Sequence, residues 1–122
     1  MLTPDTLYVQ IFADRLVATN AGTGETAEVR RDARSASPRM LVGDFTLAQQ
    51  EMKEAVKAVR RGWRSPEILL HPMERIEGGI TPIEARVLLE LGAGAGASRV
   101  AVHTGPALSG LAVREAIRGA KG

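Results

Sequence analysis

The sequence predicts an α/β fold with a mixed five-stranded sheet and three helices. Two observations predict it. Short stretches of alternating apolar and polar side chains fill the N-terminal part, and from residue 46 onward helix-like and strand-like stretches alternate. The first pattern is typical of an antiparallel hairpin or meander, and the second of parallel strands joined by helices. Because 122 residues is the size of one domain, we expect residues 1–122 to form a single unit.

The N-terminal strands are expected to form a hairpin. In TLYVQIFA, the apolar residues Leu7, Val9 and Ile11 fall on one face of an extended chain. A polar break at Asp14 is followed by RLVAT, which predicts the second strand. ETAEVRR predicts a weaker third strand, and RRDARSASPR predicts a loop.

The longest helix is predicted for TLAQQEMKEAVKAVRRG, residues 46–62. Thr46 and Gln49 have the spacing of a capping box, in which each side chain binds a backbone N–H of the first turn. Gly62 is a typical helix end. The apolar residues that recur near a period of 3.6 are Leu47, Met52, Ala55, Val56 and Val59.

The second half predicts two more helices and two strands. TPIE opens the second helix, with Thr81 as N-cap, Pro82 at the first helical position and Glu84 completing a capping box. EILLHP before this helix and RVAVH after it are short apolar stretches that predict buried strands. The third helix is expected to begin at Pro106 and to end near Gly119.

Composition excludes several classes of function. The chain has no cysteine and two histidines, so we expect no disulfide and no metal centre. A net charge of +2 with four aromatic residues in all argues against nucleic-acid binding. The N-terminus lacks the pattern of a secretory signal, and no apolar stretch is long enough to cross a bilayer. We therefore expect a soluble, cytoplasmic protein.

The segment GAGAGAS, residues 92–98, looks at first like a phosphate-binding loop. Such a loop leaves a strand and opens a helix, so that backbone N–H groups converge on the anion. Here the order is reversed, because the second helix is expected to end at Gly92 and a strand to follow. The segment also lacks the Lys-Ser/Thr ending of a P-loop. We expect its glycines to serve the helix end and the tight turn.

HTGPALSG, after the last predicted strand, has the order that a ligand loop needs. It offers Thr104, Ser109 and His103 but no lysine and no carboxylate to orient a His103–Ser109 pair. We expect no catalytic residue and no bound cofactor.

Residues 81–110 resemble the MreB-type bacterial actins, the filament proteins that guide rod-shaped growth. The residues that carry the resemblance are Thr81, Glu84, Arg86, Ala95, Gly96, Ala97, Ser98, Arg99, Val100, Pro106 and Gly110. VGDFT before the first helix and the N-terminal hairpin resemble the same family more weakly. The resemblance implies a ribonuclease-H-like, actin-like half domain that corresponds to subdomain IA of the first lobe.

Departures from the family pattern bear on activity. The resemblance implies two phosphate-binding turns and an acidic pair before the proline, but Thr104 and Gly105 stand where that pair is expected. We therefore expect no ATP hydrolysis, because the general base and the phosphate contacts are missing together. The inserted MERIEG, residues 73–78, also alters an edge that the family uses in filaments. The implied role is interaction or scaffolding, with the chain itself or with cell-shape proteins as partner.

A second hypothesis is a small regulatory domain of the STAS type, which has a similar order of strands and helices. Its switch is a phosphorylatable Ser or Thr at a helix start. Thr46, Thr81 and Thr104 are the candidates, although each is also explained as a cap. Phosphorylation by a cognate kinase would favour this hypothesis.

The basic stretch around Trp63 leaves two interpretations open. Arg60, Arg61 and Arg64 suit the negative end of a helix, and Trp is buried on average, which favours packing onto the core. The resemblance instead implies that this turn touches a membrane. Trp favours the bilayer interface and arginines bind anionic headgroups, so the four residues would form a weak membrane or partner patch at the inner face of the membrane.

Overall fold

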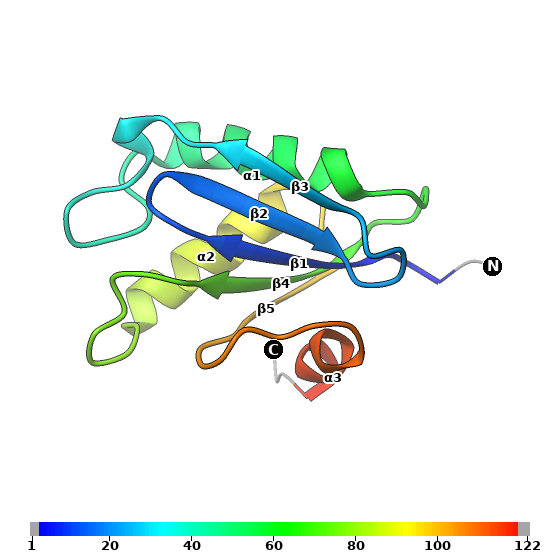
Figure 1. Ribbon diagram of the computed structural model, residues 1–122. Helices are drawn as coiled ribbons and strands as arrows, with labels where there is room; N and C mark the ends of the chain where they lie inside the picture. The colour runs from blue at the N-terminus through cyan, green and yellow to red at the C-terminus, as the bar shows by residue number, and fades with distance from the viewer. Residues whose placement is uncertain (1–2, 120–122) are drawn as a thin grey trace.

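The computed structural model describes residues 3–119 and confirms the predicted α/β class. Five strands form one mixed sheet in the order β3-β2-β1-β4-β5 (Figure 1). The strands are β1 (Thr6–Ile11), β2 (Arg15–Asn20), β3 (Thr26–Arg30), β4 (Glu67–Pro72) and β5 (Arg99–Val102). The weak third strand is therefore real, and the order of strands and helices along the chain is the predicted one.

The sheet combines an antiparallel meander with a parallel part. β1 pairs with β2 and β2 with β3 in antiparallel fashion, whereas β1, β4 and β5 are parallel. Val9 at the centre of β1 lies opposite Ala18 of β2 on one side and Leu70 of β4 on the other. The carboxyl ends of the three parallel strands therefore lie at one edge of the sheet, where α/β folds commonly place ligands.

Three helices enclose the sheet in three layers. They are α1 (Phe45–Val59), α2 (Pro82–Gly94) and α3 (Leu111–Gly119). α1 and α2 cover the face that carries Leu7, Val9 and Ile11, and α3 packs on the opposite face against Tyr8 and Leu69 (Figure 1). Successive side chains of β1 therefore alternate between two hydrophobic cores, one on each face of the sheet.

The first helix begins one residue earlier than predicted and has a different cap. Asp44 is the N-cap, and its carboxylate accepts a hydrogen bond from the backbone N–H of Leu47 at 3.0 Å. Thr46 lies inside the first turn, and Gln49 donates to the carbonyl of Leu91 on α2 at 3.0 Å. The predicted Thr46–Gln49 capping box is therefore wrong: Gln49 joins two helices instead of closing one. The helix also ends at Val59, before Gly62.

The capping box of the second helix is confirmed. The Thr81 hydroxyl accepts from the Glu84 N–H at 3.1 Å, and the Glu84 carboxylate accepts from the Thr81 N–H at 2.8 Å. Pro82 occupies the first helical position as predicted. The third helix differs from its prediction, because it begins at Leu111 and Pro106 lies in the loop that precedes it.

The glycine-rich segment closes α2 and turns the chain into β5, as predicted, but the helix ends at Gly94, two residues later than expected. Gly92 is buried, and a Cβ atom there would lie 2.6 Å from Cγ1 of Val100. Only a glycine lets the end of α2 approach β5 so closely. Gly96 follows with φ of +95°, a backbone conformation that favours glycine.

A buried ion pair fixes the segment between β3 and α1, which contains the 3-10 helix η1 (Ala33–Ser35). Arg31 Nε donates to Glu51 of α1 at 2.9 Å, and its other nitrogens donate to the carbonyls of Phe12 and Ser35. The second oxygen of Glu51 accepts from the Ser35 hydroxyl at 2.6 Å and from the Asp32 N–H at 2.8 Å. Both charged groups therefore have several partners, as buried charges require.

Candidate functional site

Trp63 lies on the turn between α1 and β4 and is 77% exposed. The turn is at the same end of the molecule as the N-terminal segment (Figure 1). The interpretation that Trp63 packs onto the core is wrong, because Trp63 is exposed and belongs to neither hydrophobic cluster. Trp is one of the residue types that are enriched at protein interfaces, so an exposed Trp63 marks this turn as a candidate contact surface.

The turn that carries Trp63 is held in one shape by hydrogen bonds. The guanidinium of Arg60 donates to the carbonyls of Gly62, Trp63 and Arg64 at 3.2, 3.0 and 3.1 Å. The carboxylate of Asp5 accepts from the N–H groups of Arg61 and Gly62 at 2.7 and 2.8 Å. The exposed indole is thus presented by an ordered backbone.

Acidic side chains partly neutralise the arginines of this turn. Arg61 forms a bidentate ion pair with Glu25, with Nε 2.6 Å from Oε1, and this hydrogen bond lowers the pKa of the Glu25 carboxyl. Burial raises the pKa of Asp5, but the N–H groups of Gly62 and Arg61 outweigh it and hold the pKa below its ordinary value. The predicted patch is therefore exposed and basic, with the Glu25 carboxylate paired with Arg61 and the Asp5 carboxylate bound to the backbone of the turn.

A second cluster lies at the carboxyl edge of the parallel strands. Tyr8 Oη lies 2.6 Å from Nδ1 of the buried His71, and Nε2 of His71 lies 3.0 Å from the carbonyl of Gly105. A carbonyl only accepts, so Nε2 carries the proton, and Nδ1 accepts from the Tyr8 hydroxyl. The N–H of Leu108 in turn donates to the Tyr8 oxygen at 3.1 Å. In this way the loop after β5 is tied down over the edge of the sheet.

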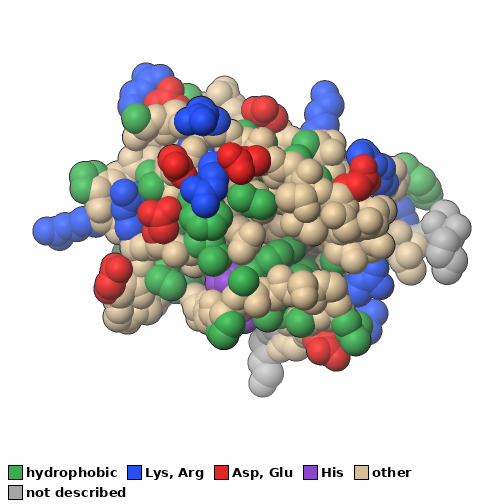
Figure 2. Space-filling model, viewed as in Figure 1, with side chains coloured by type: hydrophobic (Ala, Val, Ile, Leu, Met, Phe, Trp, Pro, Cys, Tyr) green, Lys and Arg blue, Asp and Glu red, His purple; other side chains and the backbone are tan. Residues whose placement is uncertain are grey.

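The imidazole of His103 completes this cluster. It meets the ring of His71 edge-on, with centroids 4.7 Å apart, and its Nε2 lies 3.0 Å from the carbonyl of Pro106. Burial and then the nearby His103 lower the pKa of His71, which keeps it neutral. Among residues 3–119 no carboxylate is hydrogen bonded to either ring, so this cluster lacks the acid that would orient a base. Figure 2 shows the histidines largely covered by other side chains.

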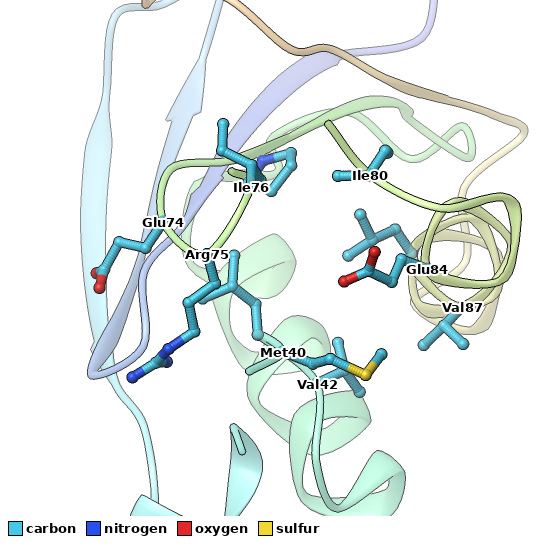
Figure 3. Close-up of a pocket in the computed structure, with 11 residues that line it drawn as sticks. Met40, Val42, Glu74, Arg75, Ile76, Ile80, Glu84 and Val87 are labelled. Atoms are coloured by element: carbon cyan, nitrogen blue, oxygen red, sulfur yellow. The ribbon is translucent and has the colours of Figure 1, made fainter. Parts of the chain in front are cut away.

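An apolar pocket opens between the segment before α1, the loop after β4 and the first turns of α2 (Figure 3). It has a volume of about 320 Å³, including the part open to solvent. The carboxylate of Glu84 points toward its centre from α2. Its lining residues are Met40, Leu41, Val42, Pro72, Glu74, Arg75, Ile76, Ile80, Glu84, Val87 and Leu88.

This pocket is formed by segments that no sequence pattern brings together. Its only signal was the inserted MERIEG, whose residues Glu74, Arg75 and Ile76 form one wall. The insertion was expected to alter an edge of the fold, and it also forms part of the pocket.

None of the described helices combines the length and the apolar character needed to cross a membrane. No family model matches the chain. The uncharacterized protein YjaA of Escherichia coli (strain K12) is 29% identical over 97 residues, which cover 73% of this chain and 75% of YjaA.

A solved structure with a similar fold is the crystal structure of MreB 5 of Spiroplasma citri bound to AMPPNP. The TM-score is 0.58 at 14% identity, over 85% of this chain. The chain thus has an actin-like fold. It spans 39% of the length of the MreB 5 chain, so it corresponds to part of that protein.

Proposed function

We propose that this chain is a non-catalytic, MreB-related interaction or scaffold domain of the cell-shape machinery, and that the turn of Arg60, Arg61, Trp63 and Arg64 is its contact surface. The observation that carries the proposal is the exposed Trp63 on a turn whose backbone is held by Arg60 and Asp5. Trp and Arg are the residue types that contribute most energy to protein interfaces.

The ordered turn favours binding because little conformational freedom remains to be lost. Ordering a mobile side chain or loop at an interface costs free energy that is subtracted from the affinity. Here the hydrogen bonds of Arg60 hold the carbonyls of residues 62–64 before any partner arrives. A partner would therefore meet Trp63 in a shape that needs little change.

The absence of catalysis is proposed from the carboxyl edge of the sheet. The MreB 5 crystal contains AMPPNP, and actin-like ATPases need an acidic group near the hydrolytic water. In this chain Thr104 and Gly105 stand at that place, and the nearby His71 has both nitrogens occupied by Tyr8 and Gly105. Within residues 3–119, no carboxylate is hydrogen bonded to His71 or His103.

A weak contact with an anionic membrane is the second candidate for the same turn. The exposure of Trp63 favours it, because an indole is stable at the bilayer interface. The ion pair between Arg61 and Glu25 weakens it, because one cation is then compensated within the protein. A protein partner is therefore the first choice. Of the three threonines of the STAS-type alternative, Thr81 is used in a capping box, whereas Thr46 is exposed in the first turn of α1 and Thr104 is exposed in the loop after β5, and neither of these two is a cap.

The proposal is tested by co-sedimentation with polymerised MreB-type protein from the same cell. We expect the wild-type chain to pellet with the filaments and Trp63→Ala to remain in the supernatant. Leu111→Ala is the matched control, because Leu111 is 66% exposed on α3 and lies outside the turn. Equal pelleting of wild type and Trp63→Ala would exclude the turn as the contact.

A further inference from the structure

β3 is the outermost strand of the sheet, and among the described residues it pairs with β2 alone (Figure 1). Helix α1 packs on one face of β3, and neither α2 nor α3 reaches it. At the other edge of the sheet, β5 is in contact with α2 on one face and with α3 on the other. The edge of β3 is therefore the more accessible of the two sheet edges.

The register of β3 on β2 shows which backbone groups are free. A hydrogen bond from the Arg31 N–H to the Asp14 carbonyl, at 2.9 Å, closes one end of this antiparallel ladder. Hydrogen-bonded residues alternate along such a ladder, so every second residue of β3 before Arg31 binds β2. The N–H and C=O groups of the residues in between point outward, where the described chain has no further strand. These residues are Thr26, Glu28 and Arg30.

Glu28 and Arg30 place opposite charges on this edge. Both side chains are exposed, on the sheet face that α1 does not cover. Neither forms an ion pair within residues 3–119. Arg30 instead lies directly opposite Arg15 of β2, and like charges at opposing positions destabilise paired strands. A carboxylate that approached Arg30 from the outer side would offset this repulsion.

The other charged residues of β2 and of the segments that flank β3 already have partners of opposite charge. Glu28 and Arg30 are therefore the charges of this edge that remain to be compensated. The existing ion pairs are Asp14–Arg15, Glu25–Arg61, Arg31–Glu51 and Asp32–Arg34.

Charges on an edge strand commonly prevent it from pairing with another chain. They do so when the approaching strand meets a charge of its own sign. Glu28 and Arg30 differ in sign and stand two positions apart, so an antiparallel second copy can oppose each to the other. β3 also contains no proline or glycine, and no bulge interrupts its register on β2. The edge therefore keeps the regular geometry that pairing needs.

We propose that two copies of this chain associate through β3 in antiparallel fashion, with Glu28 of each copy opposite Arg30 of the other. The two-fold axis passes beside Val29, and the outward backbone groups of Glu28 and Arg30 form the hydrogen-bonded pairs. A register centred on Glu28 would instead oppose two carboxylates, so the charges select one alignment. The inference is independent of the role proposed for Trp63, because the two surfaces share no residue.

Sedimentation velocity over a concentration series of the full chain measures the association. We expect a reversible dimer with a Kd of about 10–100 µM, because a short strand edge gives an interface at the small end of the specific range. Hydrogen exchange followed by NMR should show the amides of Glu28 and Arg30 becoming protected as the dimer forms. The amides of Ala27 and Val29, which face β2, should be protected at every concentration. A monomer at about 1 mM, or a dimer without protection of Glu28 and Arg30, would overturn the proposal.

Charge reversal tests the alignment. Glu28→Arg and Arg30→Glu each bring like charges together in the dimer and should weaken it about tenfold or more. Both sites are exposed, so the fold should be retained, which urea unfolding checks. An equimolar mixture of the two variants should associate again, because each supplies the charge that the other needs.

Matched controls separate this pairing from an effect of net charge. Glu115→Arg and Arg118→Glu make the same changes of charge at exposed positions of α3 and should leave the Kd unchanged. If the β3 variants dimerise as the wild type does, or if their mixture stays monomeric, the Glu28–Arg30 alignment is wrong.

Discussion

The hydroxyl of Tyr8 and the Nδ1 atom of His71 form a 2.6 Å hydrogen bond between the two central parallel strands. This bond and the contact of His71 Nε2 with Gly105 occupy both imidazole nitrogens. His71 is 1% exposed, so a second proton would charge a buried ring and displace the Tyr8 hydrogen. The arrangement therefore stabilises the fold with His71 neutral.

We first predict that stability falls as the pH drops below about 6.5, the ordinary pKa of histidine. Burial lowers the pKa of His71 in the folded chain, so the unfolded chain takes up the proton first. The stabilisation is complete above about pH 6.5 and is lost progressively as the pH falls toward the lower, folded pKa. Urea unfolding at several pH values measures it. His71→Gln should lack this slope, and an identical slope in that variant would contradict the prediction.

We next predict that the Arg31–Glu51 ion pair is essential for stability. Glu51→Ala leaves the Arg31 guanidinium buried without its carboxylate and removes the acceptor of the Ser35 hydroxyl. Breaking a buried pair in this way costs about 3–5 kcal/mol. Chemical denaturation measures the loss, and Glu54→Ala on the exposed face of the same helix should change stability by less than about 0.5 kcal/mol. A loss for Glu51→Ala that matches the control would be inconsistent with this account.

The two predicted caps provide a third prediction. Thr81→Ala removes a confirmed N-cap and should cost roughly 1 kcal/mol in the free energy of unfolding. Thr46→Ala should cost less than about 0.5 kcal/mol, because Thr46 is exposed inside the first turn of α1. Asp44→Ala should resemble Thr81→Ala, since Asp44 caps α1. Thermal or urea unfolding of the three variants measures these losses of stability. A loss for Thr46→Ala as large as that for Asp44→Ala would contradict the prediction.

The cap of α1 shows where local sequence signals stop being sufficient. Thr46 and Asp44 are both good cap residues, two positions apart. The choice between them depends on the chain path before the helix, where the Asp44 N–H donates to the carbonyl of Arg34 and the Gly43 N–H to that of Ser35. Those bonds depend on the buried Arg31–Glu51 pair, which no local pattern reveals. Thr81 had no competitor nearby, and its prediction is confirmed.

The candidate site was predictable only in part for the same reason. The alternation of β1 predicted which side chains face the main core, because strand periodicity is local. The exposure of Trp63 depends on Asp5, which is 58 positions away in the chain and shapes the turn through the N–H groups of Arg61 and Gly62. The pairing of Arg61 with Glu25 also joins residues that are far apart in the chain, 36 positions in this case. The sequence places Arg60, Arg61, Trp63 and Arg64 on one turn, but it does not show which side chains pair with them.

A fourth prediction concerns nucleotide. We expect no saturable binding of magnesium-ATP, because the loop after β5 is tied to Tyr8 and His71 and because Thr104 and Gly105 stand where the MreB resemblance implies an acidic pair. An NMR titration with ATP and magnesium measures this, with an MreB-type protein from the same cell as positive control. Saturable, magnesium-dependent shifts at the edge of β5 would contradict the prediction.

The last prediction separates membrane contact from protein contact at Trp63. The formal charges of Arg60, Arg61, Arg64, Asp5 and Glu25 sum to one positive charge at the turn. One exposed indole and one net cation give weak attachment that salt screens. We expect little co-sedimentation with anionic vesicles at low salt and none at high salt.

Glu25→Gln tests this account directly, because it frees Arg61 from its ion pair. A cation near an anionic surface contributes ~1 kcal/mol, so vesicle binding at low salt should rise about fivefold. Trp fluorescence should shift to shorter wavelength in the bound form, and the double variant Trp63→Ala with Glu25→Gln should lose most of the gain. If Glu25→Gln binds vesicles no better than wild type while Trp63→Ala still abolishes co-sedimentation with filaments, the turn recognises protein and not lipid.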